Sequence, residues 1–167
     1  MTRPRVLVAG IGNIFLGDDA FGVEVVRRLL GRPLPEGVRV ADFGIRGLDL
    51  AHALTDDCDA AILVDATQRG GPPGTLYVLE PHTCLAEGRD LMDSVLATHG
   101  MHPARVLELI QAQGSPCPLL RIVGCEPATL GSEEEPAMGL SPPVGAAVNE
   151  AVRMVEELVR EILADFR

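Results

Sequence analysis

The chain has 167 residues, 47% of them apolar, which is enough to bury the core of a single domain spanning residues 1–167. Its formal net charge is −10 and all 14 cationic side chains are arginine, which argues against a nucleic-acid-binding surface and excludes a Schiff-base lysine or P-loop lysine. No apolar run approaches the roughly 20 residues of a membrane span, so we expect neither nucleic acid nor a membrane as partner.

The chain opens with the pattern of a buried strand followed by a helix. Residues 5–10 form a short apolar run, rich in β-branched residues, that ends in Gly10 and predicts a strand. Apolar residues at helical spacing then predict a helix that ends at Gly31 and Pro33, and Asp18 is expected to cap its amino terminus.

The alternation of strands and helices continues as far as residue 65. Strands are predicted over residues 37–41 and 60–64, with a short helix over residues 48–54 between them. The two strands end at Asp42 and Asp65. Such alternation favours a mainly parallel sheet with right-handed crossovers.

The second half of the chain adds a strand of opposite direction. Residues 75–79 follow a glycine- and proline-rich turn that is too short for a parallel crossover, so this strand is predicted to run antiparallel. A helix beginning at Pro103, a strand over residues 119–123 and a final helix striped from Val144 to Ile162 follow. We therefore predict a three-layer α/β fold with a mainly parallel five-stranded sheet, one antiparallel strand and helices on both faces.

A long connection, residues 127–143, separates the fifth predicted strand from the final helix. It is punctuated by glycine and proline and contains the acidic run of residues 133–135. This composition is typical of a solvated surface loop.

The four cysteines show no CxxC spacing, which is typical of reduced thiols rather than of a disulfide framework or a thiolate zinc site. We expect a cytoplasmic protein that acts as a monomer.

Ligands of a doubly wound sheet bind beyond the carboxyl ends of its strands, near the point where strand order reverses. The glycines between Gly10 and Gly22 must first be tested there as a dinucleotide fingerprint, and they fail. The third glycine, Gly17, is too late in the motif, and Asp18 with Asp19 would repel a pyrophosphate. Asp42 does lie where the ribose-binding acid of a dinucleotide site would be, so a nicotinamide-nucleotide site remains a minor alternative.

Three residues near the expected reversal between strands one and three could instead hold a divalent ion. With Asp18 at the helix cap, Asp19 is spare, while Asp65 ends a strand and His99 precedes a helix. Each has an ordinary structural explanation, namely capping, a turn or a hydrogen-bonded bystander. If they converge, two carboxylates and an imidazole suit nickel or zinc and leave positions open for water or substrate.

These residues belong to an ordered series of motifs that resembles the hydrogenase maturation protease family over nearly the whole chain. The series runs from Gly10-Ile-Gly12-Asn13 with Asp18-Asp19 and Gly22, through Asp42 with Gly44 and Gly47, Leu63-Val-Asp65-Ala66, and His99 with Val106-Leu107, to Val123-Gly-Cys-Glu-Pro127 and Gly139-Leu-Ser141. A lone GxGN would be a weak signal, but the ordered series is specific.

The resemblance implies an aspartic-type endopeptidase that removes the C-terminal extension of a nickel-loaded hydrogenase large-subunit precursor. By position, Asp19, Asp65 and His99 would be both the catalytic and the nickel-contacting residues, with Asp19 standing where some relatives have Glu. The nickel would arrive with the substrate, so no permanently bound cofactor is expected. Asp42 and Gly44 would contact the substrate, although residues 42–47 depart from the family's frequent Asp-Gly-Gly-Thr pattern.

Two other functions stay open at this point, and two further hydrolase classes are disfavoured. A hydrolase carrying its own zinc would use the same three ligands, and a non-cleaving chaperone that checks nickel loading would use the same site. A cysteine hydrolase built on Cys125 is disfavoured because no local feature brings His99 or His102 to it. His102, Cys125 and Glu126 are expected to have supporting or structural roles, and a serine triad lacks its GxSxG motif.

Overall fold

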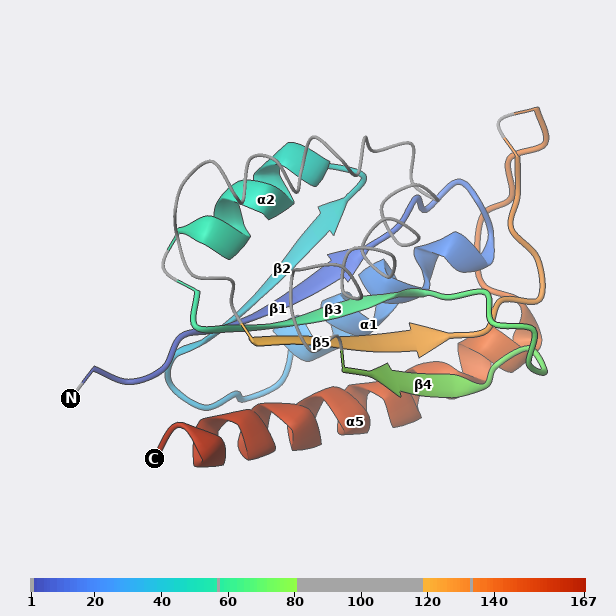
Figure 1. Cartoon of the computed structure of the whole chain (residues 1–167). Helices are drawn as coiled ribbons and strands as arrows, with labels where there is room; N and C mark the ends of the chain where they lie inside the picture. The colour runs from blue at the N-terminus through green and yellow to red at the C-terminus, as the bar shows by residue number, and fades with distance from the viewer. Residues whose placement is uncertain (1, 57, 81–118, 133) are drawn as a thin grey trace.

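The computed structural model describes residues 2–56, 58–80, 119–132 and 134–167, and Figure 1 shows a sheet with helices on two sides. The strands are β1 (Val6–Ile11), β2 (Val38–Gly44), β3 (Ala60–Ala66), β4 (Leu76–Leu79) and β5 (Leu119–Cys125). The helices are the 3-10 turn η1 (Asp18–Ala20), α1 (Phe21–Leu30), α2 (Gly47–Thr55) and α5 (Pro142–Asp165). The helix predicted at Pro103, His99 and His102 lie outside the described residues.

The strand order of the sheet is β2-β1-β3-β5-β4. β1 pairs in parallel with β2 and β3, and β3 pairs in parallel with β5. β4 lies antiparallel to β5, with Tyr77 opposite Gly124, because the turn before it leaves no room for a crossover. The predicted fold class, including the direction of β4, is confirmed.

Both faces of the sheet are buried, which explains the continuous apolar runs of its central strands. In β1, Val6 and Val8 face one side and pack with residues of α1 and α5. The alternate residues Leu7 and Ala9 face the other side and pack with α2. Figure 1 shows the same layers, with α2 on one side of the sheet and α1 and α5 on the other.

β2 extends two residues beyond the predicted end at Asp42, and its pairing with β1 contains a bulge there. Gly10 of β1 pairs with Asp42, but the next residue, Ile11, pairs with Gly44. The extra residue, Phe43, is buried on the α2 face of the sheet. A bulge redirects the chain at a strand end, and here it shapes the segment in which substrate contacts were predicted.

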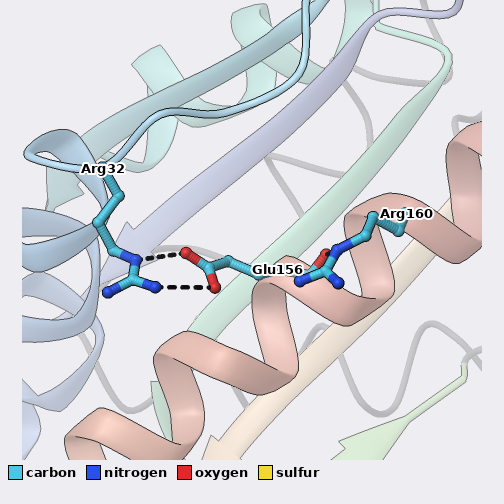
Figure 2. Close-up of polar contacts among 3 residues, drawn as sticks. All are labelled: Arg32, Glu156 and Arg160. Atoms are coloured by element: carbon cyan, nitrogen blue, oxygen red, sulfur yellow. Dashed lines mark hydrogen bonds and ion pairs between the residues drawn. The ribbon is translucent and has the colours of Figure 1, made fainter.

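The final helix α5 carries the predicted apolar stripe, which is buried against α1 and the sheet. The guanidinium of Arg32, just beyond α1, forms two hydrogen bonds with the Glu156 carboxylate on α5 (Figure 2). Arg160, one turn further along α5, donates to the backbone oxygen of Glu156 at 3.3 Å. Among the described residues, no helix is long and apolar enough to cross a bilayer.

Candidate active site

The strand order reverses between β1 and β3, as the sequence predicted. From β1 the chain passes to β2 on one side and then returns to β3 on the other. The carboxyl ends of β1 and β3 are therefore adjacent, and η1 packs at this edge against β3. In a doubly wound sheet this is the position at which ligands bind.

Two glycines let the start of α1 approach this edge closely. A Cβ on Gly22 would lie 2.0 Å from the backbone oxygen of Val64, the residue before Asp65. Gly12 has a φ of +142°, and a Cβ there would lie 1.8 Å from the backbone oxygen of Asp19. Side chains at either position would push η1 off the sheet, so these glycines keep Asp19 near the end of β3.

The structure thus brings Asp19 and Asp65 to the same edge of the sheet. Both are fully buried, Asp19 within η1 and Asp65 within β3. The Asp19 carboxylate accepts a hydrogen bond from the backbone N–H of Asn13, 2.9 Å from its Oδ2 atom. Asn13 belongs to one of the sequence motifs, but the motif alone did not predict this hydrogen bond. The third predicted residue, His99, lies outside the described residues.

Within the described part of the chain, no group of three or more His, Cys, Asp or Glu side chains is arranged to hold a metal ion. The predicted site needs only two of its ligands from this part, the carboxylates of Asp19 and Asp65, with His99 as the third. Carboxylate oxygens with one imidazole can bind nickel, and this ligand set stays a prediction.

Asp18 does not cap a helix, and that prediction is wrong. Neither η1 nor α1 has a side-chain cap. The Asp18 carboxylate instead accepts four hydrogen bonds at 2.7–3.1 Å, from the amides of Ala128, Thr129 and Ser141 and from the Ser141 hydroxyl. Burial raises the pKa of Asp18, but these hydrogen bonds outweigh it and hold the pKa below its usual value.

The connection between β5 and α5 is largely exposed, as predicted, but it is also fixed to the loop after β1. The Gly17 amide donates to the Ala137 oxygen at 2.8 Å, and the Ala137 amide donates to the Phe15 oxygen at 2.8 Å. Together with the Asp18 hydrogen bonds, these contacts hold Ala128, Thr129, Ala137 and Ser141 of this connection beside η1 and the loop before it. Ser141 also belongs to a sequence motif, but the motif did not predict that this residue binds Asp18.

Glu126 has the structural role expected by default. Its buried carboxylate accepts hydrogen bonds from the amides of Arg69 and Gly70 and from the Tyr77 hydroxyl, at 2.8–3.0 Å. Burial raises the pKa of Glu126, but its hydrogen bonds bring the pKa below the usual value. Burial also raises the pKa of the neighbouring Cys125 thiol to about 12, which argues further against a cysteine nucleophile there.

A hollow of about 330 Å³ lies between the ends of β1 and β2, and one of its lining residues, Asn13, donates the backbone hydrogen bond to Asp19. We call it the β1–β2 hollow, and its lining includes Asn13, Phe15, Asp42, Gly44, Ile45 and Arg46. The predicted substrate-contact residues Asp42 and Gly44 therefore lie at one hollow. Gly44 has a φ of +54°, in the left-handed region that favours glycine.

Comparison with known proteins agrees with this architecture. The family model described as hydrogenase maturation protease matches residues 23–158. The chain is 33% identical to the hydrogenase 2 maturation protease of Escherichia coli over 94% of this chain and 92% of that protein. It is 33% identical to the hydrogenase expression/formation protein HupD of Rhodobacter capsulatus over 96% and 72%, respectively.

Solved structures give the same result. The hydrogenase maturating endopeptidase HybD from Escherichia coli superposes with a TM-score of 0.79 at 33% identity, covering 94% of this chain and 93% of that one. A hydrogenase 2 maturation peptidase from a Thaumarchaeota archaeon superposes with a TM-score of 0.66 at 35% identity, covering 93% and 97%. The chain is therefore a peptidase that belongs to the hydrogenase maturation protease family.

Proposed function

We propose that this peptidase removes the C-terminal extension of a nickel-loaded hydrogenase large-subunit precursor, with Asp19, Asp65 and His99 as its catalytic and nickel-contacting residues. The observation that carries the proposal is that two buried carboxylates, Asp19 in η1 and Asp65 in β3, lie on contacting elements at the strand reversal of a maturation protease. We also propose that the reaction takes place in the cytoplasm, because the cysteine spacing predicts reduced thiols.

Peptide hydrolysis adds water across the amide bond and yields one new carboxyl group and one new amine. A carboxylate at Asp19 or Asp65 can accept the proton of the attacking water and return it to the leaving amine. Nickel belongs to the precursor in this scheme, and binding it through the two carboxylates and His99 would place the adjacent peptide at the site. A precursor without nickel would lack this contact and stay uncut.

The experiment is an intact-mass measurement on the co-encoded large-subunit precursor, prepared nickel-loaded and nickel-free and incubated with the protein. Loss of a C-terminal fragment from the nickel-loaded sample alone is the expected result, and each precursor incubated without the protein is the control. Equal cleavage of both samples would contradict the nickel requirement. No cleavage of either, with binding confirmed, would favour the non-cleaving chaperone.

Metal analysis of the gently purified protein distinguishes the proposed peptidase from a hydrolase that carries its own zinc. The proposal expects no stoichiometric metal, because the nickel arrives with the precursor. One tightly bound zinc per chain would support a hydrolase with its own metal.

A further inference from the structure

The β1–β2 hollow shares a residue with the carboxylate site. Asn13 lines the hollow, and its backbone N–H donates to the Asp19 carboxylate at 2.9 Å. The hollow is therefore separated from the Asp19 carboxylate by the backbone of Asn13. A peptidase must bind its substrate chain near the bond that it cuts, and this hollow is joined through Asn13 to the proposed catalytic carboxylate of Asp19.

Two large apolar side chains from different strand ends line the hollow while remaining open to solvent. Phe15, in the loop after β1, and Ile45, directly after β2, are each 54% exposed. Exposed apolar side chains that gather at one hollow mark a binding surface, because covering them removes apolar area from water. Charged side chains, Arg27, Asp42 and Arg46, also line the hollow, but the part formed by Phe15 and Ile45 is complementary to an apolar side chain.

The wall that carries Ile45 is fixed before any ligand binds. Arg46 donates hydrogen bonds to the backbone oxygens of Asp42 and Phe43, and its guanidinium lies 5.9 Å from the centre of the Phe43 ring. The Gly12 amide donates to the Gly44 oxygen at 3.0 Å, which joins this wall to the loop after β1. A fixed wall lowers the ordering cost of binding and sharpens selection by shape.

We propose that the β1–β2 hollow receives an apolar side chain of the substrate peptide close to the cleaved bond, and that Phe15 and Ile45 select that side chain. This inference rests on the proposed function, because it places the cut at Asp19 and Asp65. The volume of about 330 Å³ is at the low end of ligand pockets, which suits a short peptide segment rather than a folded element.

The test compares Ile45→Ser and Phe15→Ser with the control Leu30→Ser. Leu30 is 60% exposed and ends α1, at the far end of that helix from the Gly22 contact with β3. On nickel-loaded precursor we expect kcat/KM to fall about tenfold for each hollow variant, mainly through KM, and to stay within about twofold for Leu30→Ser. Thermal midpoints of all three variants check that they remain folded.

A second measurement does not depend on cleavage. A synthetic peptide spanning the precursor's cleavage region is titrated calorimetrically into wild type and Ile45→Ser, and about tenfold weaker binding to the variant is expected. If wild type cleaves the precursor and Ile45→Ser has the same kcat/KM, the inference is overturned. The proposed function is left intact by that result. Wild type that binds the peptide no better than Ile45→Ser would overturn it even if no cleavage were seen.

Discussion

Asp18 and Glu126 are as fully buried as Asp19 and Asp65, yet the two pairs have different surroundings. Asp18 and Glu126 each accept several hydrogen bonds from distant parts of the chain and so fix a connection beyond the carboxyl ends of the strands. Asp19 in η1 and Asp65 in β3 instead lie at the end of the sheet where the strand order reverses. Burial alone therefore does not single out a carboxylate for the proposed chemistry, and we base the proposal for Asp19 and Asp65 on their place at the strand reversal.

The largest expected effect is on activity, from Asp19→Asn. This change keeps the size of the side chain but removes its charge and basicity, so cleavage of nickel-loaded precursor should slow by about 10²–10⁴-fold. The rate is followed by intact mass, and circular dichroism checks the fold. Asp19→Glu is the matched control and should keep part of the activity, since it retains the carboxylate. Equal rates for Asp19→Asn and wild type would remove Asp19 from the catalytic set.

Asp18→Asn should mainly lower stability, by about 3 kcal/mol in the free energy of unfolding measured with urea. An amide there offers one oxygen to four donors and turns an NH₂ group toward some of them. Ser141→Ala removes only the hydroxyl donor and should cost about 1 kcal/mol. If Asp18→Asn were as stable as wild type, Asp18 would not anchor residues 128–141.

Glu126→Gln should cost less, about 1–2 kcal/mol at pH 7, because fewer donors lose their carboxylate. The folded-state pKa of Glu126 lies below its usual value of 4.5, so its contribution to stability is complete above that pH and is lost as the pH falls through the lowered value. The difference in the free energy of unfolding between wild type and Glu126→Gln should therefore become smaller below about pH 4.5. Urea titrations at several pH values measure it, and a gap that widened toward acid would contradict this assignment.

The smallest expected effect comes from Arg32→Gln, which breaks the ion pair with Glu156 (Figure 2). Half of the Arg32 side chain is exposed, so solvent screens the pair. We expect the thermal midpoint to stay unchanged within error at physiological salt. A clear drop would show that the link between α1 and α5 contributes more than ordinary surface pairs do.

The sequence was sufficient to predict the sheet because the signals involved are local. Apolar runs identified the strands, and the short turn before β4 required its antiparallel direction. The rule that ligands bind where strand order reverses then selected a set of polar residues that includes Asp19 and Asp65, and the family resemblance chose these two from it.

The roles that the sequence did not predict depend on long-range contacts. Asp18 looked like a helix cap because its partner Ser141 is 123 positions away, and no local pattern links the two. The bulge at Phe43 likewise depends on how β2 pairs with β1 rather than on its own composition. The motif positions of Asn13 and Ser141 were visible, but only their hydrogen bonds reveal what they do.

The most direct test of the central comparison measures cleavage of nickel-loaded precursor by Asp65→Asn and Glu126→Gln, under conditions where both variants are folded. Intact mass over time gives the rate at which the C-terminal fragment is released. Asp65→Asn should be slower than wild type by about a hundredfold or more, and Glu126→Gln should cleave at close to the wild-type rate. Equal rates for Asp65→Asn and wild type would contradict the assignment of the two carboxylates at the strand reversal to the chemistry.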